Sequence, residues 1–258
     1  MATGDAGSPI WARPEPGSRR PRFTREQIAV TALGIADREG FQAVSMRRVA
    51  AELGAATMSL YHYVRTKDEL VALMDDALMA ETLIPPGELP GNWRDALAAV
   101  ARRTRAVLVG HSWALFALQE SQFGPGAMRH FEQSLAVVAG TGLDLAARLD
   151  LLAVVDDYVF GNALHAGEAR KRSAAAAADP GTVSQVIEFG LAQLRTGQFP
   201  HTQELLGGKD PRSFPDDPPG PAIDEKSLAE QFERGLQAVL DGAAARMGIA
   251  GLPAKPPG

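Results

Sequence analysis

A short run of hydroxyl, aromatic and basic side chains at residues 57–67 has the composition of a surface that contacts DNA. It reads Thr-Met-Ser-Leu-Tyr-His-Tyr-Val-Arg-Thr-Lys. If the run is helical, Leu60 and Val64 lie four residues apart and can anchor one face in a core. The other side then presents small donors, rings and positive charge, which suit the base edges and phosphates of a DNA groove.

Helix-start and helix-stop residues on either side predict the elements that position this run. Thr24 and Gln27 form a capping box, and Gly40 ends the helix that follows. Ser45 is a good N-cap for a second helix. Gly54 then allows the tight turn that sets the next helix at an angle. These signals predict a helix-turn-helix.

A second capping box, Thr66-Lys67-Asp68-Glu69, opens a fourth helix. Lys67 is poorly placed for folding there, because cations are disfavoured near a helix N-terminus. A nearby DNA phosphate would explain this lysine.

The stretch from Leu53 to Lys67 resembles the tetracycline repressor (TetR) family of bacterial transcriptional regulators. The resemblance covers about residues 24–84, and its most specific string is Gly54, then Leu60-Tyr61, then an aromatic, then Lys67 before a capped helix. It implies an all-helical homodimer whose grip on operator DNA is loosened by an effector in the C-terminal domain. Such a dimer is expected to bind double-stranded DNA with a palindromic operator.

Symmetry predicts how such a dimer binds, because two recognition helices must enter successive major grooves about 34–36 Å apart. We expect bases to be read by Arg47, Met58 and Ser59, with Thr57 beside them. We expect phosphates to be held by Tyr61, His62, Tyr63, Lys67 and the backbone NH at the cap residue Ser45.

Charge and composition limit the classes of protein to which this chain can belong. The net charge is −5, but nine Lys or Arg and four Asp or Glu between Arg19 and Lys67 leave +5 there and −10 elsewhere. A basic N-terminal part on an acidic body is typical of localised DNA binding, although chance clustering is an alternative. The absence of cysteine excludes disulfides and cysteine-ligated metals, and no apolar run predicts a membrane span or a signal peptide. We therefore expect a cytoplasmic protein with no membrane partner.

The predicted fold class is all-α. An N-terminal three-helix DNA-binding domain with the helix-turn-helix is expected at residues 22–84, and a larger helical ligand-binding and dimerisation domain at residues 90–248. Prolines and glycines near residues 84–91 mark the boundary. Residues 1–21 are expected to be a disordered arm with a basic end, either a solvated tail or a minor-groove arm, and residues 249–258 a disordered tail.

Two long apolar helices, at about residues 143–171 and 224–247, are predicted to form a four-helix dimer interface with their mates in a second copy. The first is apolar nearly all round and must be buried on several sides. The resemblance supports this prediction, because family members dimerise through two late helices. The expected interface residues are Leu152, Val159, Leu228, Phe232, Leu236 and Val239.

An effector pocket is expected to be apolar with a few polar groups. Candidates for it are aromatic, methionine and polar residues of the body, each of which is alternatively plain core or surface. They are His111, Trp113, Phe116, Gln119, Met128, Phe131, Asp157, Phe160, Asn162 and His165.

The body also resembles the branch of the family that contains the tetracycline sensors, through Gln133-Ser134-Leu135 and Phe160-Gly161. Those sensors hold magnesium–tetracycline partly with a histidine just before the helix that bears the first string. Here the corresponding stretch, residues 117–120, contains no histidine. Neither tetracycline, nor a metal, nor any cofactor is therefore predicted.

Two alternatives remain beside a ligand-responsive repressor. One is a DNA-binding regulator without an effector, and the other is a helical enzyme. His111 and Ser112 are adjacent and do not face each other on a helix, and no strand precedes them as a nucleophile elbow requires. No HExxH, phosphate loop or dinucleotide fingerprint occurs. The sequence therefore predicts that the protein is not an enzyme.

Overall fold

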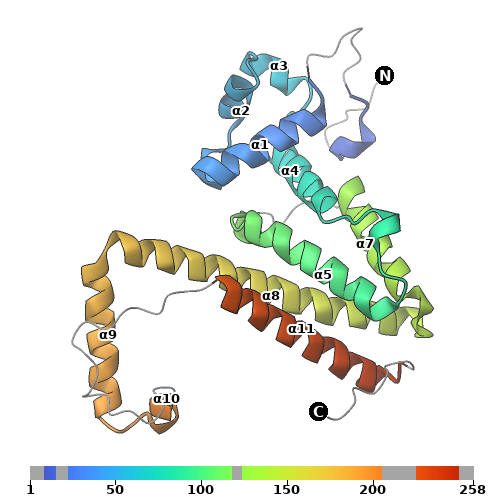
Figure 1. Cartoon of the computed structure of the whole chain (residues 1–258). Helices are drawn as coiled ribbons and strands as arrows, with labels where there is room; N and C mark the ends of the chain where they lie inside the picture. The colour runs from blue at the N-terminus through green and yellow to red at the C-terminus, as the bar shows by residue number, and fades with distance from the viewer. Residues whose placement is uncertain (1–8, 16–22, 118–123, 205–224, 250–258) are drawn as a thin grey trace. The chain divides into compact units, whose positions relative to one another are not determined.

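The computed structural model describes residues 9–15, 23–117, 124–204 and 225–249, and every regular element in these ranges is a helix (Figure 1). The predicted all-α class is confirmed. The chain divides into two compact units, Met1–Leu164 with Arg234–Gly258, and His165–Glu233. This division falls inside helices α8 and α11 and not at the predicted boundary near residue 84, because α4 packs against both α1 and α7.

Three short helices build the helix-turn-helix: α1 (Arg25–Glu39), α2 (Met46–Glu52) and α3 (Thr57–Tyr61). The Thr24 capping box is formed as predicted, and Ser45 caps α2 by accepting from the Arg48 backbone NH. Gly40 and Gly54 have positive φ, 85° and 62°, where L side chains are strained. Each predicted stop is therefore in place, and α3 ends at Tyr61.

Helix α4 (Lys67–Glu81) joins the DNA-binding part to the body. The Thr66 side chain caps it by accepting from the Glu69 backbone NH. Leu70, Met74 and Leu78 are almost fully buried along one stripe. Helix α4 packs against both α1 and α7.

Residues 9–15 are folded, so the prediction of a disordered arm over residues 1–21 is wrong for this segment. Ile10, in the 3-10 helix η1 (Ile10–Ala12), is only 1% exposed. The Arg25 guanidinium donates to the carbonyls of Ile10 at 2.8 Å and Arg13 at 2.7 Å. Arg13 pairs with Glu69 of α4 at 2.5 Å. The basic residues Arg19, Arg20 and Arg22 lie outside the described residues, as does most of the predicted C-terminal tail.

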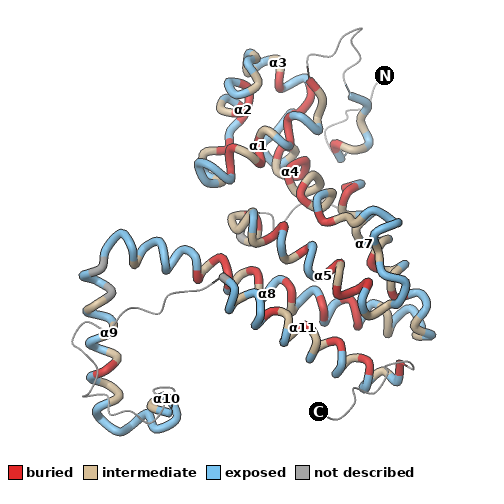
Figure 2. The backbone as a smooth tube through the Cα atoms, in the orientation of Figure 1, coloured by how far each residue is buried: buried red, intermediate tan, exposed pale blue. Residues whose placement is uncertain are grey.

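The body in the first unit consists of α5 (Trp93–Gly110), α6 (Ala114–Ala117), α7 (Pro125–Val138), η4 (Ala139–Thr141), the start of α8 (Leu145–Ala178) and the end of α11 (Glu225–Met247). Figure 2 shows that their buried residues gather on the sides that face one another. Arg105 of α5 donates to Asn162 of α8 at 2.6 Å. A side chain at Gly235 of α11 would clash with Tyr158 of α8, so these two helices are in close contact.

The start of α7 is held by α4 and by the N-terminal segment. Asp76 Oδ1 accepts from the backbone NH groups of Gly126 at 2.5 Å and Ala127 at 3.3 Å. Trp11 and Asp76 both lie against Gly124, and a Cβ there would stand 2.7 Å from the Trp11 ring. These contacts tie the body to the DNA-binding part.

The second unit contains the end of α8, α9 (Pro180–Arg195), α10 (Pro200–Glu204) and the first turns of α11. The alanine run at residues 174–178 continues α8. Asp179 caps α9 by accepting from the Thr182 backbone NH. No helix in the described ranges has the length and apolar character needed to cross a membrane.

Candidate DNA-binding surface and effector cavity

The outer side of α3 carries the residues that the sequence predicts to read DNA. Met58 is 72% exposed and Tyr61 is 41% exposed, and His62 is also exposed. Thr57 and Ser59 are half-buried, while Leu60 is fully buried as the predicted anchor. The helix therefore presents a hydroxyl, aromatic and apolar face outward on a fixed base.

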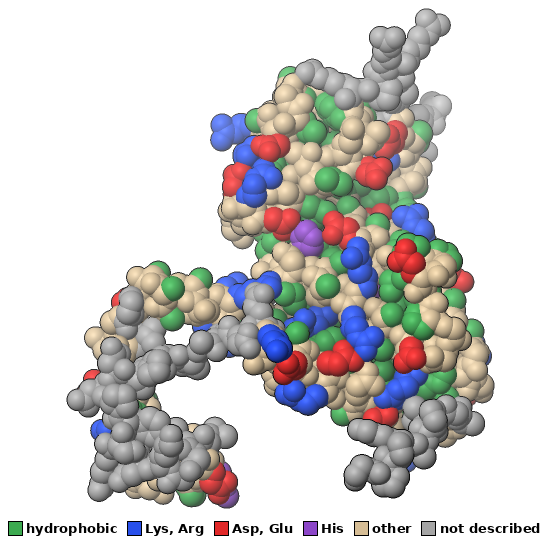
Figure 3. Space-filling model, viewed as in Figure 1, with side chains coloured by type: hydrophobic (Ala, Val, Ile, Leu, Met, Phe, Trp, Pro, Cys, Tyr) green, Lys and Arg blue, Asp and Glu red, His purple; other side chains and the backbone are tan. Residues whose placement is uncertain are grey.

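Two adjacent arginines of α2 differ in their availability. Arg48 pairs with Glu39 at 2.6 Å and with Glu52 at 2.7 Å. These hydrogen bonds, with Glu39 first, raise the pKa of Arg48 and lower the pKa of both carboxyls. Arg47 is exposed and makes no ion pair with the described part of the chain. Figure 3 shows basic and acidic side chains interleaved over the visible face of this part. Arg47 is therefore the cation of α2 whose charge is available to DNA.

Tyr63 belongs to the core and not to the predicted phosphate-binding set. It is 8% exposed, and its ring lies 4.7 Å from that of Phe23. Its carbonyl accepts from Arg25 Nε at 3.3 Å. The physical reason is position, because Tyr63 follows the buried Leu60 by three residues and falls on the same side of the chain.

Lys67 has a neighbour within the chain that the sequence does not indicate. It is exposed at the first position of α4, and its Nζ lies 5.5 Å from the ring centroid of Phe41. Phe41, in η2 (Phe41–Ala43), is stacked on Trp113 with ring centroids 5.5 Å apart and planes inclined by 10°. Ser45, the other predicted phosphate contact at a helix start, is exposed.

His111 and Trp113, predicted to contact the effector, instead lie where the end of α5 meets the DNA-binding helices. Trp113 Nε1 donates to Asp37 Oδ1 of α1 at 2.7 Å. His111 Nδ1 lies 2.8 Å from the same oxygen, and its Nε2 lies 3.3 Å from Glu81 Oε2 of α4. These two side chains therefore connect the body to α1 and α4.

The other predicted effector residues are spread over the body. Asn162 is bonded to Arg105. Gln119 and the side chain of Phe116 lie outside the described residues. The rest are exposed on α7 or α8, namely Met128, Phe131, Asp157, Phe160 and His165.

Two titratable groups of the body have shifted pKa values. Burial lowers the pKa of His130 on α7, whose Nδ1 lies 2.8 Å from Thr82 Oγ1 at the end of α4. Desolvation, and then the charge of the adjacent Asp157, raise the pKa of Asp156 on α8 to about 6. Asp156 is nevertheless exposed at the helix surface, so solvent screening makes its effect on stability smaller than the shift implies.

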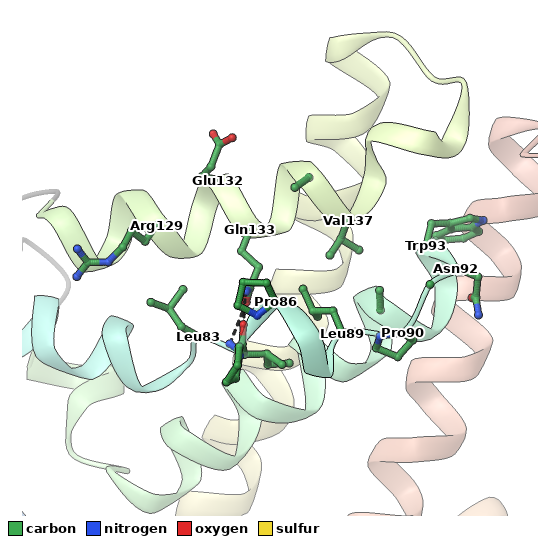
Figure 4. Close-up of a pocket in the computed structure, with 15 residues that line it drawn as sticks. Leu83, Pro86, Leu89, Pro90, Asn92, Trp93, Arg129, Glu132, Gln133 and Val137 are labelled. Carbon is green, nitrogen blue, oxygen red and sulfur yellow. Dashed lines mark hydrogen bonds between the residues drawn. The ribbon is translucent and has the colours of Figure 1, made fainter.

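A cavity of about 720 Å³ lies between α7 and the linker that joins α4 to α5 (Figure 4). Its walls are mainly apolar, and Gln133 points from α7 to the linker. The Gln133 amide accepts from the Ile84 backbone NH at 3.2 Å and donates to the Ile84 carbonyl at 2.7 Å. The size suits a drug-sized ligand, since such pockets span about 300–1,000 Å³. The lining residues are Leu83, Ile84, Pro85, Pro86, Leu89, Pro90, Gly91, Asn92, Trp93, Ala96, Arg129, Glu132, Gln133, Ala136 and Val137.

Two family models match this chain, one on each side of the linker that joins α4 to α5. Residues 28–74 match the family described as bacterial regulatory proteins, tetR family, and residues 85–247 match the tetracyclin repressor-like C-terminal domain. The chain belongs to the TetR family. It is therefore a DNA-binding transcriptional regulator and not an enzyme.

Relatives of this TetR-family regulator are similar over nearly its whole length. The HTH-type transcriptional repressor DrrR1 of Streptomyces coeruleorubidus is 37% identical, covering 89% of this chain and 80% of that protein. An HTH-type transcriptional regulator of Saccharopolyspora erythraea is 33% identical and covers 93% of each chain. The structure of ActR from Streptomyces coelicolor in complex with actinorhodin matches with a TM-score of 0.66 and 28% identity, covering 89% of this chain and 99% of that one.

Most of the predicted dimer residues of this TetR-family regulator are already buried within one chain. Leu152, Val159, Phe232 and Leu236 are at most 5% exposed, so they cannot contact a second copy. Leu228 and Val239 are half-buried. The largest exposed apolar groups in the middle of α8 are instead Val154, at 46%, and Phe160, at 44%.

Sequence reasoning missed the cavity beside the linker. The prolines and glycines of the linker indicated a domain boundary, and no ligand site was predicted there. The usable signal was the apolar character of Leu83, Ile84, Leu89 and Trp93 around those prolines. A solvated linker has no reason to carry four large apolar side chains.

Proposed function

We propose that this TetR-family regulator acts in the cytoplasm as a homodimeric repressor that releases a palindromic operator when a small organic effector binds its body. The observation that carries the proposal is the exposed face of α3 with Met58 and Tyr61, flanked by the free cation of Arg47 and by Lys67. A protein that does not bind DNA gains nothing from this exposure. Two such faces related by a two-fold axis read the two halves of a palindrome.

The DNA-binding proposal is tested with the matched pair Arg47→Ala and Arg48→Ala, using an operator selected from random duplexes. Fluorescence anisotropy is measured over a range of salt concentrations. We expect Arg47→Ala to weaken binding, because its charge is free to meet DNA. If that contact is a phosphate, the salt slope also falls by about 0.9. Arg48→Ala leaves the slope unchanged, because Glu39 and Glu52 already neutralise that charge. Equal effects of the two variants would contradict the assignment of Arg47.

The proposed dimer interface uses the exposed side of α8 around Val154 and Phe160, with Ala238 and Gly242 on the exposed side of α11. The small side chains on α11 allow two helices to approach closely. Val154→Glu places a charge on this face, and we expect monomers in sedimentation together with loss of operator binding. Val30→Glu, at a similarly exposed valine of α1, is the control and leaves the dimer intact. A dimeric Val154→Glu variant would exclude this face.

We place the effector in the cavity beside the linker. The linker follows α4 directly, so a ligand that wedges it away from α7 also displaces the helix on which the DNA-binding part rests. An effector shifts the equilibrium only through its different affinity for the two positions of α4. Because ActR binds actinorhodin, actinorhodin is the first probe.

Ala136→Trp fills this cavity from α7, and Ala146→Trp adds the same bulk on the exposed start of α8. We expect the probe to release operator from the parent and from Ala146→Trp, and to leave Ala136→Trp bound. Release of Ala136→Trp as well would move the effector site elsewhere. If a wider panel of organic compounds never releases the parent, the chain is a DNA-binding regulator without an effector.

A further inference from the structure

Lys67 lies at a position where folding disfavours a cation. It occupies the first turn of α4, where the partial charge of the helix is positive, and it makes no ion pair with the described part of the chain. Its Nζ instead lies 5.5 Å from the Phe41 ring centroid, within the distance of about 6 Å at which a ring face attracts a cation. The ring therefore compensates part of the unfavourable placement and limits where the ammonium group can be.

Phe41 is itself in contact with the body. Trp113 stacks on it almost in parallel, with ring centroids 5.5 Å apart. The Trp113 indole is locked by its hydrogen bond to Asp37, and His111 reaches the same carboxyl and meets the Trp113 ring edge-on at a centroid distance of 6.3 Å. The position of the Phe41 ring is thus decided by a residue outside the helix-turn-helix.

We propose that Trp113, acting through the Phe41 ring, positions Lys67 for a DNA backbone phosphate. This inference rests on the proposed phosphate contact of Lys67. A lysine ammonium on a four-carbon stem has many rotamers, and fixing it in advance reduces the ordering that DNA binding requires. Trp113 and Phe41 are positioning residues and do not touch DNA.

Through this arrangement, a change in the body can also alter the contact of Lys67 with the operator. Trp113 immediately precedes α6 and follows the end of α5, so a shift of this segment withdraws the ring that supports Phe41. Lys67 then loses its fixed position while the recognition helix stays folded. The route acts on a phosphate contact, so it changes affinity for all sequences and leaves base preference unchanged.

A double-mutant cycle tests this route, since coupled residues give non-additive effects. Trp113→Leu, Lys67→Ala and the double variant are compared with the parent for operator affinity and salt slope. We expect Lys67→Ala to weaken binding about tenfold and to lower the slope by about 0.9. We expect Trp113→Leu to weaken binding about threefold in the parent and not at all in the Lys67→Ala background. Trp113→Phe keeps a ring for the stack and restores parent affinity.

The control is Trp11→Leu, which removes a tryptophan that lies against Gly124 and is not in the stack. Its effect, of whatever size, is the same in both backgrounds. If Trp113→Leu also weakens both backgrounds by the same factor, its role is general packing and the inference is overturned. If Lys67→Ala alone changes neither affinity nor slope, the phosphate role itself fails, which is a different result from additivity.

A second readout does not depend on DNA. We expect the protons of the Lys67 side chain that lie over the Phe41 ring to be shifted upfield in the NMR spectrum of the free protein. We expect Phe41→Leu to abolish this shift, and Trp113→Leu to reduce it while the thermal midpoint and the dimer remain. An unchanged Lys67 shift in a folded Trp113→Leu variant would overturn the positioning role.

Discussion

The DNA-binding part buries most of its large apolar side chains, whereas helix α9 of the second compact unit leaves large apolar side chains exposed. In residues 23–82, Ile28, Ile35, Leu60 and Leu70 are fully buried. Helices α1, α2 and α4 each begin at a residue whose hydroxyl group caps the helix. In the unit His165–Glu233, helix α9 leaves Val186 and Phe189 about two-thirds exposed, at 65% and 66%. Alanines make up much of the small buried set there.

The difference shows which part is complete by itself. The DNA-binding part buries its large side chains within one chain and leaves outside mainly those proposed to meet DNA. In the described part of the second unit, helix α9 leaves apolar side chains exposed. Large exposed apolar groups that cluster on one helix are typical of an interaction surface. Substitutions in the two regions should therefore change stability and operator binding by different amounts.

The largest difference is expected between Leu60→Ala and Leu191→Ala. Leu60 is fully buried beneath the recognition face, whereas Leu191 of α9 is 9% exposed. Leu60→Ala should lower the free energy of unfolding by about 2–5 kcal/mol and abolish operator binding. Leu191→Ala should cost less, because the sparser surroundings can close around the smaller side chain. Urea unfolding followed by circular dichroism measures both, and equal losses would break the comparison.

A second pair compares two helix caps. Asp76 accepts from two NH groups of α7 and is half-buried between α4 and α7, whereas Asp179 caps α9 at the surface. We expect Asp76→Ala to lower the free energy of unfolding by about 0.5–2 kcal/mol, the usual range for a lost cap. Asp179→Ala should cost less, because its carboxylate is fully solvated. A larger loss at Asp179, measured in parallel denaturant titrations, would show that α9 is more constrained than its exposure indicates.

The pH dependence of stability should depend on His130 of α7. Burial lowers the pKa of His130 below 6.5, so the folded chain disfavours its charged form. Above pH 6.5 both states hold it neutral. As the pH falls below 6.5, the unfolded chain takes up the proton first and stability is lost. His130→Gln should flatten the change in thermal midpoint between about pH 7.5 and about pH 5.5. A thermal midpoint that changes with pH in His130→Gln as it does in the parent would refute this cause.

The smallest effects are expected from Val186→Thr on α9 and Val30→Thr on α1. Both valines are more than half exposed, so each change should stay within about 0.5 kcal/mol of the parent. Unfolding at several protein concentrations sharpens the comparison. A clearly larger and concentration-dependent loss for Val186→Thr alone would mean that a second copy covers α9 in the dimer.

Features that depend on neighbours in sequence could be predicted well. The caps at Thr24, Ser45 and Thr66 all form, because each needs only a backbone NH three residues away. Leu60 is buried and Met58 is exposed, as helical spacing requires. The sequence from Gly54 to Lys67 indicated the TetR family and, through the family, the function.

Features that depend on distant residues could not be predicted in the same way. Tyr63 follows the buried Leu60 by three residues, but the Phe23 ring that packs against it comes from before α1. Ile10 sits in a segment whose composition indicates disorder, but Arg25 binds its carbonyl from α1. The cavity beside the linker needs α7, which lies about forty residues further along the chain.

By itself the sequence determined the all-helical class, the helix-turn-helix and the family, because caps, glycine stops and apolar spacing act within a few residues. Only the tertiary structure decided which arginine of α2 keeps its charge free, which leucines of α8 and α11 are already covered, and which aromatic ring supports Lys67. Each of these depends on side chains that are brought together from separate helices. Their distance in space is decided by packing and leaves no local pattern to read.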